Sequence, residues 1–358
     1  LVDGKIVVKN YFDFTNLADV LTIHYAFSEN GQTVQHGELI ANCEPQQTAC
    51  LPLALPADNG KLCLLTLSYH LNQASDLLEQ HHVLGFDQLK LFEHPFVAAL
   101  PKAEAEALQV EQSNKWLTVK NSQVEYQFDK GKGIIAAIQR NGKAVIEQPL
   151  DFNIWRAPLD NDGLAKNLWQ QAGYQRAYTR AYSVEYQQQA DGVLVSAQCA
   201  IVAVAQARIL DFGVNYFIHH NGDIEIRLQA KRPAHLPFLP RFGLRFFLAK
   251  QHEKLSYFGY GSGESYLDKH HHAQLGLFHT TAKENHVDYV KPQENGSHCG
   301  CEYLQTADFV VTADQPFSFN FSPYTQEELT TKAHHYELVE SAHNVLCVDY
   351  KMSGIGSN

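Results

Sequence analysis

The sequence has seven cysteines but lacks any C-x-x-C pair; the cysteines are Cys43, Cys50, Cys63, Cys199, Cys299, Cys301 and Cys347. An odd number of cysteines without paired spacing argues against both a disulfide framework and a zinc ribbon. We therefore expect buried free thiols in a reducing compartment, the cytoplasm.

Excess basic charge is absent as well. Lys and Arg total 28 against 39 Asp and Glu, so the formal net charge is −11. Nucleic-acid-binding surfaces show as basic patches, so we expect no nucleic-acid partner. No apolar run reaches the roughly 18 residues of a membrane span, so we expect no membrane partner. We recognise no signal-peptide pattern, and Leu1 in place of Met predicts a piece of a longer polypeptide.

Two common catalytic motifs are missing. No G-x-S-x-G nucleophile elbow occurs. The glycine-rich stretch GYGSGES, Gly259 to Ser265, lacks the lysine of a phosphate loop and the G-x-G-x-x-G spacing of a nucleotide site. We interpret it as a turn with close backbone contacts.

The turn dipeptides and the alternating apolar pattern of the sequence are typical of an all-β protein. Asn-Gly steps occur at Asn30, Asn59, Asn141, Asn221 and Asn295, and this dipeptide supplies the positive φ of tight hairpin turns. Apolar residues alternate with polar ones in 124–128, 224–228 and 317–321, which predicts strands with one face on a core and one in water.

The length of 358 residues predicts two domains. The segment 94–112 has two prolines and no strand alternation, and it marks the boundary. We expect a small immunoglobulin-like β-sandwich over 1–100, a linker over 101–112 and a large antiparallel β-sandwich over 113–358.

Only two segments have helix signals. In the first, DGLAKNLWQQAGY, Asp162 is the expected N-cap and Gly173 the expected C′ residue. In the second, YTQEELTTKAHHYEL, Thr325 and Glu328 have capping-box spacing, so we expect a short surface helix there.

The stretch NIWRAPLDNDG raises the question of chemistry. On an extended strand Asp160 and Asp162 would lie roughly 7 Å apart on one face, near the separation of an inverting glycosidase pair. The neighbouring Pro158 and Gly163 favour instead a turn, in which aspartates cap helices. Arg156 could recognise a carboxylate, but an ion pair with a nearby aspartate is the more common outcome.

Two histidine-rich stretches could suggest a metal. Side chains of the consecutive His270, His271 and His272 do not converge on one ion, so we expect a solvated loop. His298 lies beside Cys299 and Cys301 but lacks a fourth ligand at finger-type spacing. We expect no metal in this chain.

Four motifs carry a resemblance to a known family. They are WRAPLDND (155–162), YFGYGSGESYLDK (257–269), YVKPQENGSHCGCEYL (289–304) and FSFNFSPYTQEEL (317–329). In this order they resemble the C-terminal portion of the long-chain β-galactosidases of glycoside hydrolase family 2. LLTLSYHL (64–71) looks like the small sandwich domain before that portion, and VDYKMSGIGSN (348–358) like the family's last conserved stretch.

The resemblance implies a large sandwich of the galactose-mutarotase type and a whole protein that hydrolyses terminal β-D-galactosides such as lactose. In the family a (β/α)₈ barrel carries both catalytic glutamates, and we expect its magnesium and sodium ions there too. None of that barrel is in this chain. We therefore expect the isolated chain to be inactive, with no catalytic residue and no cofactor, and to shape the active-site rim and contribute oligomer contacts.

The resemblance also names rim residues. The family's glycine after DND starts a mobile loop at the active-site mouth, which corresponds here to Gly163, and this loop is shorter here. Arg156, Asp160 and Asp162 would hold its base. A sugar-stacking tryptophan of the family has no counterpart between residues 296 and 317, where Tyr303 and Phe309 are the candidate replacements, against ordinary core packing.

Two other functions compete with this interpretation. One is a free-standing aldose 1-epimerase, which needs a general acid and a general base facing one sugar, for instance His298 and Glu294. The other is a non-catalytic carbohydrate-binding module that holds saccharides through exposed aromatic side chains.

Overall fold

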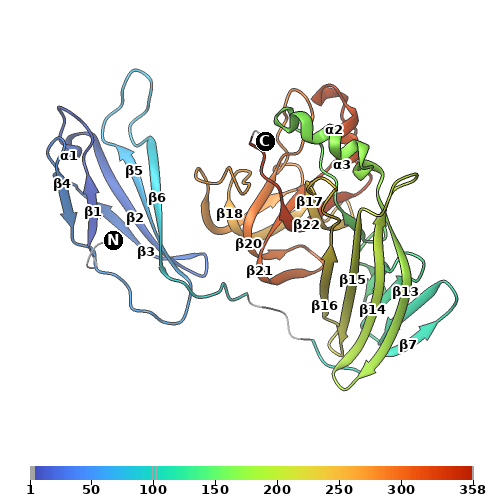
Figure 1. Ribbon diagram of the computed structural model, residues 1–358. Coiled ribbons are helices and arrows are strands. Elements are labelled where there is room, and N and C mark those ends of the chain that lie inside the picture. The colour runs from blue at the N-terminus through green and yellow to red at the C-terminus, as the bar shows by residue number, and fades with distance from the viewer. Residues whose placement is uncertain (1–4, 99, 101–102, 357–358) are drawn as a thin grey trace. The chain divides into compact units, whose positions relative to one another are not determined.

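The computed structural model describes residues 5–98, 100 and 103–356. The chain divides into two compact units, Leu1–Ala98 with Leu275–Leu277, and Ala99–Gln274 with Phe278–Asn358. Antiparallel strands build both units, and the described helices are short (Figure 1). The predicted all-β sandwich class is confirmed.

The first unit contains one four-stranded sheet and one two-stranded sheet. The order of the larger sheet is β3-β2-β5-β6, built from β2 (Leu21–Glu29), β3 (Gln32–Leu39), β5 (Cys63–Leu71) and β6 (Val83–Phe92). The smaller sheet pairs β1 (Ile6–Lys9) with β4 (Thr48–Leu51), and the short helix α1 (Leu17–Val20) precedes β2. Phe27 and Leu65 are fully buried in the core of this unit.

Three sheets make up the second unit. The first has the order β11-β10-β9-β8-β7, from β7 (Gln109–Gln112), β8 (Trp116–Lys120), β9 (Val124–Asp129), β10 (Ile134–Arg140) and β11 (Lys143–Ala144). The second has the order β13-β14-β15-β16, from β13 (Tyr178–Gln189), β14 (Gly192–Val202), β15 (Leu210–His219) and β16 (Ile224–Lys231).

The third and largest sheet has the order β12-β17-β22-β21-β20-β18-β19. Its strands are β12 (Asp151–Asn153), β17 (Arg241–Leu248), β18 (Lys254–Gly261), β19 (Gln274–Thr281), β20 (Ser297–Gln305), β21 (Val310–Ser322) and β22 (Asn344–Met352). One core joins all three sheets, because Phe128 of β9, Tyr216 of β15 and Phe319 of β21 belong to the same buried cluster.

The expected linker 101–112 is only partly irregular. Residues 101 and 102 lie outside the described residues. Gln109–Gln112 form strand β7, which pairs antiparallel with β8, so the last four residues of that segment belong to the sheet. The sequence missed this strand because it is short and mostly polar.

The alternating pattern correctly predicted strands but not always their environment. β9 alternates buried and half-buried residues as expected. In β21 the polar residues Ser318 and Asn320 are buried along with the phenylalanines, so the expectation of a solvated face is wrong there. β21 lies between β22 and β20 in the middle of the sheet, and Asn320 donates a hydrogen bond to the Asn295 carbonyl in the loop before β20.

In each Asn-Gly step the glycine has positive φ, from 66° to 85°, and the steps at Asn30, Asn141 and Asn221 form turns between consecutive strands. Two of them, at Asn30 and Asn141, also place the asparagine at positive φ and connect β2 to β3 and β10 to β11. Asn59 and Asn295 lie in longer loops instead of tight hairpins.

Both expected helices exist, and both are shorter than their segments. α2 spans Gly163–Gln171, and Gly173 follows it at φ 81° as the expected C′ residue. α3 spans Gln326–Thr331, where the Thr325 hydroxyl accepts a hydrogen bond from the Glu328 amide at 3.1 Å.

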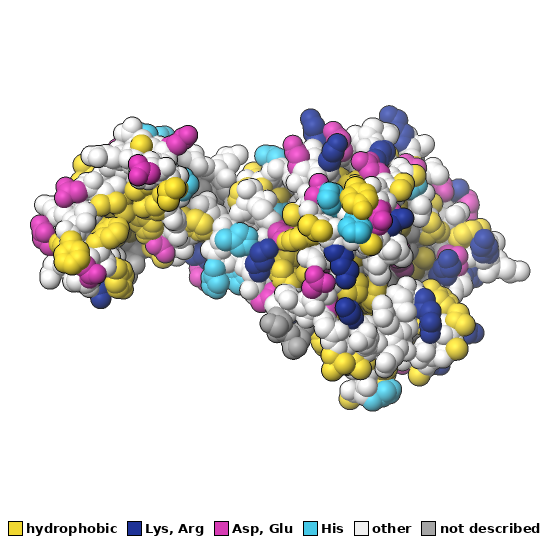
Figure 2. Space-filling view, turned by 90° about the horizontal axis from the view of Figure 1, so that it is seen from above, with side chains coloured by type: hydrophobic (Ala, Val, Ile, Leu, Met, Phe, Trp, Pro, Cys, Tyr) yellow, Lys and Arg dark blue, Asp and Glu magenta, His cyan; other side chains and the backbone are white. Residues whose placement is uncertain are grey.

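No helix in the described part of the chain combines the length and apolarity that a membrane crossing needs. Acidic and basic side chains are interspersed on the face of the second unit in Figure 2.

Candidate functional site: the base of the 153–163 loop

Two buried tryptophans anchor the loop that follows β12. The Asn153 side chain accepts a hydrogen bond from the Trp155 amide at 2.9 Å and thereby fixes the start of the loop. Trp155 and Trp169 are buried and meet edge to face, with ring centroids 6.4 Å apart. This contact holds the loop against helix α2, so the position of α2 depends on the loop.

Arg156 is fully buried and pairs with Asp162. Its Nη2 lies 2.6 Å from Asp162 Oδ1, and neither side chain is exposed to solvent (0% and 0%). Asp162 Oδ2 also accepts a hydrogen bond from the Leu159 amide at 2.8 Å. The guanidinium lies over the Trp169 ring at 5.4 Å. The structural ion pair that the spacing favoured is confirmed.

The two aspartates do not form a catalytic pair. Asp160–Asp162 form a 3₁₀ turn, so the extended geometry with a 7 Å separation on one face is wrong. The side chain of Asp160 is 78% exposed and lies 3.4 Å from Lys291 Nζ, whereas Asp162 is buried. Asp162 occupies the N-cap position of α2, but its side chain turns back to Arg156 and Leu159 and makes no capping hydrogen bond. An inverting mechanism needs both carboxyl groups facing one substrate bond, which this turn prevents.

The same arginine holds the segment that follows β22. Arg156 Nη1 donates to the carbonyl oxygens of Ser353 at 3.1 Å and Gly354 at 2.9 Å. From the other side, Asp268 accepts hydrogen bonds from the amides of Ile355 at 3.0 Å and Gly356 at 2.6 Å. Partial burial disfavours the charge of Asp268, but these amides outweigh it and lower the pKa of this carboxyl. The loop base and residues 353–356 therefore form one clamped unit.

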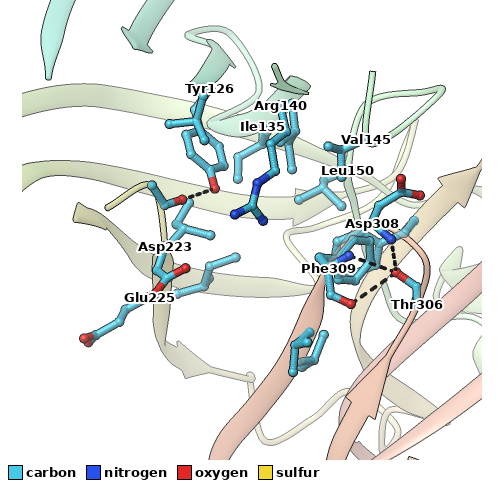
Figure 3. Close-up of a pocket in the computed structure, with 18 of the residues that line it drawn as sticks. Tyr126, Ile135, Arg140, Val145, Leu150, Asp223, Glu225, Thr306, Asp308 and Phe309 are labelled. Carbon is cyan, nitrogen blue, oxygen red and sulfur yellow. Dashed lines mark hydrogen bonds between the residues drawn. The ribbon is translucent and has the colours of Figure 1, made fainter. Parts of the chain in front are cut away.

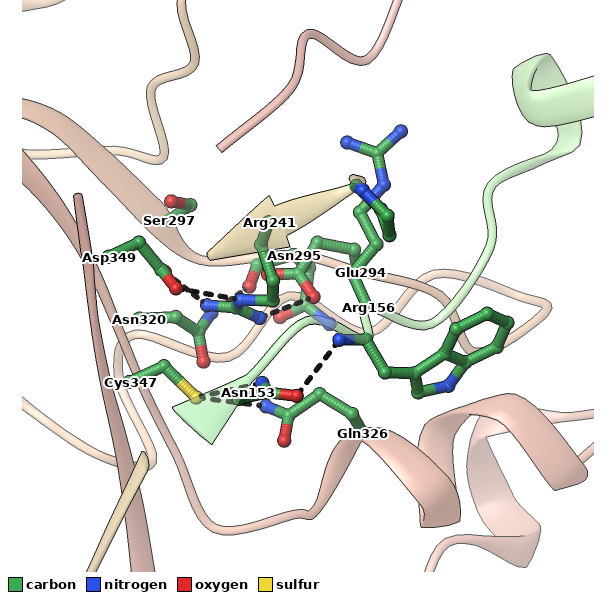
Figure 4. Close-up of polar contacts among 12 residues, drawn as sticks. Asn153, Arg156, Arg241, Glu294, Asn295, Ser297, Asn320, Gln326, Cys347 and Asp349 are labelled. Carbon is green, nitrogen blue, oxygen red and sulfur yellow. Dashed lines mark hydrogen bonds and ion pairs between the residues drawn. The ribbon is translucent and has the colours of Figure 1, made fainter. Parts of the chain in front are cut away.

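A second buried arginine lies beside this unit, as Figure 4 shows. Arg241 makes a two-pronged contact with Asp349, Nε to Oδ1 at 3.1 Å and Nη2 to Oδ2 at 2.5 Å. Its Nη1 lies 3.2 Å from Glu294 Oε2. Burial raises the pKa of Glu294 to about 6, against the opposing effect of Arg241 and Arg156. Since the Glu294 amide donates to the Ala157 carbonyl at 3.1 Å, this network also fixes the 153–163 loop.

The glycine-rich stretch contributes a further ion pair. Glu264 lies 2.7 Å from Lys269 Nζ and accepts hydrogen bonds from the Tyr289 hydroxyl at 2.5 Å and the Gly296 amide at 2.9 Å. A side chain at Gly259 would put its Cβ 2.5 Å from the sulfur of Cys301. The turn predicted for GYGSGES is wrong for its first three residues, which end β18, whereas the predicted close packing is confirmed at Gly259 and absent at Gly263.

His298 is not arranged for acid–base chemistry or metal binding. It is fully buried; Nε2 lies 2.6 Å from Asn285 Oδ1, and Nδ1 lies 3.0 Å from both the Tyr260 carbonyl and the Tyr257 hydroxyl. Burial lowers the pKa of His298 to about 4, so the ring is neutral at pH 7. With Glu294 paired to Arg241 and also buried, the structure disfavours these two as an epimerase acid and base. In the part of the chain that the structure describes, no three His, Cys, Asp or Glu side chains are placed to hold a metal ion.

Tyr303 and Phe309 lie away from the loop base. The Ser297 end of β20 follows Glu294, whereas Tyr303 lies six residues further along this strand, about 20 Å at the usual rise per residue. Tyr303 donates to Gln305 Oε1 at 2.5 Å. Phe309 is in the turn after β20 and packs against Phe246 with centroids 5.3 Å apart. The structure does not bring these two aromatics together with Arg156, Asp162 and Gly163.

The residues that sequence reasoning missed are Arg241, Glu294 as an ion-pair partner, Asp349 and Asp268. Arg241 and Asp349 are 108 positions apart, and their pairing follows from the register in which Gly243 lies opposite Asp349. A lone arginine at a strand start carries no sequence signal for such a partner.

A family model described as the beta-galactosidase small chain matches residues 120–358, and a second, described as domain 4 of beta-galactosidase, matches residues 6–92. The chain belongs to the β-galactosidase family. Its match is to the C-terminal region of that family, as the four motifs predicted.

Comparison with individual β-galactosidases shows how much of each protein the similarity covers. The chain is 55% identical over 359 residues to a β-galactosidase of Actinobacillus pleuropneumoniae, covering 100% of this chain and 36% of that protein. Identity to β-galactosidases of Staphylococcus xylosus and Priestia megaterium is 29% and 27%, with 99% of this chain and 36% and 35% of those proteins covered. The chain thus spans little more than a third of the length of these β-galactosidase relatives.

Proposed function

We propose that this chain is the non-catalytic C-terminal part of a β-galactosidase that hydrolyses terminal β-D-galactosides such as lactose. The observation that carries the proposal is the 55% identity along the whole chain to a protein named β-galactosidase, of which it covers 36%. The catalytic carboxylates, magnesium and sodium belong, in this proposal, to the remaining part of the protein. The free thiols support a cytoplasmic location.

The role of this chain is to shape the rim of the active site through the clamped loop base. Arg156 and Asp162 are committed to each other and to backbone groups, so they position Gly163 and α2 and transfer no proton. Asp160 is exposed beside them, in an ion pair with Lys291, and is the rim side chain that can reach solvent or substrate. Sugar stacking by Tyr303 or Phe309 stays a prediction, with no support from their positions.

Hydrolysis of o-nitrophenyl β-D-galactoside tests whether this chain is non-catalytic by itself. The purified 358-residue chain should show no turnover above buffer, whereas a full-length polypeptide with the same region should be active. Turnover that stays with the chain through further purification steps would overturn the proposal.

A rim role is tested in the full-length protein. Asp162→Asn should lower kcat/KM more than the neighbouring Asp160→Asn, because only Asp162 holds the loop base. Equal effects of the two variants would refute positioning through the ion pair. The proposed oligomer contacts are tested by light scattering of the full-length protein with and without residues of this chain's region.

A further inference from the structure

The second unit contains a cavity at which its three sheets meet. Its volume is about 790 Å³, within the usual range of small-molecule sites. Its walls come from β9 and β10, from the turn between β15 and β16, and from the turn between β20 and β21. Much of the wall is apolar, with side chains that include Ile135, Val145, Leu150, Phe246 and Phe309.

The acidic side chains around this cavity already have partners. They form these pairs: Asp308 with His252 Nδ1 at 2.6 Å, Glu225 with His219 Nε2 at 2.9 Å and with Arg227 Nη2 at 3.0 Å, and Asp223 with Asn221 Nδ2 at 2.8 Å. The contact with His219 is the largest cause of the lowered pKa of Glu225. Each of these three carboxylates therefore already has a hydrogen-bonding partner.

Arg140 differs from these carboxylates in its contacts. It is the last residue of β10, where the register pairs it with Val124 and with Lys143. Figure 3 shows its guanidinium projecting into the cavity between Tyr126 and Asp223 on one side and Phe309 on the other. Among residues 5–98, 100 and 103–356, no side chain or carbonyl forms a hydrogen bond or ion pair with this guanidinium. The Tyr126 hydroxyl beside it is already used, because it donates to the Gly222 carbonyl at 2.8 Å.

We propose that this cavity binds a small carboxylic acid with an apolar body. The carboxylate would take two parallel hydrogen bonds from Arg140, a geometry that guanidinium groups favour, and the apolar body would lie against Phe246 and Phe309. Neither the loop base nor the proposed galactosidase role uses this site.

Calorimetric titration of the 358-residue chain tests the proposal, with 4-phenylbutyrate as the probe and 4-phenylbutyramide as its uncharged analogue. The carboxylate should bind at least about tenfold more tightly than the amide, the effect expected of a charge-assisted two-pronged contact. Arg140→Gln should remove this difference, because it weakens binding of the carboxylate and leaves binding of the amide unchanged. Arg140→Lys should keep only part of the difference. Arg140 is exposed at a strand end, so these variants should keep the melting temperature of the parent chain.

Arg180→Gln is the matched control. Arg180 is also an exposed strand arginine, but it lies on β13, at the opposite edge of its sheet from β16, and is not part of the cavity wall. Its substitution should leave both affinities unchanged. Two results would overturn the proposal: no carboxylate binding at millimolar probe, whether or not lactose binds, or equal affinities for the carboxylate and the amide.

Discussion

Replacement of Asp162 by asparagine should destabilise the second unit strongly. The variant keeps the size of the side chain and an oxygen for the Leu159 amide, but it removes the charge that balances Arg156. Both side chains of the pair are 0% exposed, so the buried arginine loses the carboxylate that contacts it and keeps only the attraction of the more distant Glu294 and Asp268. Loss of one partner of a buried ion pair costs about 3–5 kcal/mol. Because Arg156 keeps its bonds to the carbonyls of Ser353 and Gly354, we expect the lower end, about 3 kcal/mol.

Asp160→Asn supplies the control two residues away. Asp160 forms an exposed ion pair with Lys291 at 3.4 Å, and exposed pairs contribute about 0–1 kcal/mol. The double variant Arg156→Met, Asp162→Asn should recover part of the loss, since no unpaired charge remains.

Urea unfolding followed by tryptophan fluorescence measures these effects in the right unit. All three tryptophans of the chain, Trp116, Trp155 and Trp169, belong to the second unit, so the signal reports on it alone. A loss of less than about 1 kcal/mol of unfolding free energy in Asp162→Asn, or a loss no greater than in Asp160→Asn, would refute a stabilising role of the buried ion pair.

Three further predictions concern single residues. Burial raises the pKa of Glu294 to about 6 from an ordinary 4.5, so the folded state keeps this proton to higher pH than the unfolded state. The parent chain should therefore gain stability relative to Glu294→Gln as the pH falls from 7 toward 4.5. A difference between the two urea midpoints that does not change with pH would contradict this. Gly259→Ala should cost about 1–3 kcal/mol of unfolding free energy through overpacking. Gly263→Ala should be neutral, because nothing lies within 4 Å of the added Cβ. Equal urea midpoints for the two variants would refute the overpacking at Gly259. Cys50 is the exposed cysteine of the seven, so Ellman's reagent should modify one thiol quickly in the folded chain and the others only in urea, and fast reaction of several thiols would show that the core opens.

Part of the loop base could be predicted from the sequence. Arg156 and Asp162 are six residues apart, and a turn signal lies between them, so a local ion pair was a reasonable expectation. Local spacing also gave Gly173 as the residue after α2 and Thr325 as the cap of α3. The side chain of Asp162 was assigned wrongly, since the buried arginine outcompetes the helix N-terminus for its carboxylate.

The sequence by itself determined the all-β class, the turns at three of the five Asn-Gly steps, the two short helices and, through four ordered motifs, the family. These properties follow from local periodicity, from backbone preferences of single residues and from matching stretches of chain. Only the tertiary structure decided that Arg241 meets Asp349 and Glu294, that Asp268 holds residues 353–356, that Ser318 and Asn320 are buried, and that Arg140 projects into a cavity. These contacts depend on strand order, register and the path of the connecting loops, which bring together side chains between 25 and 108 positions apart, and no local pattern encodes such contacts.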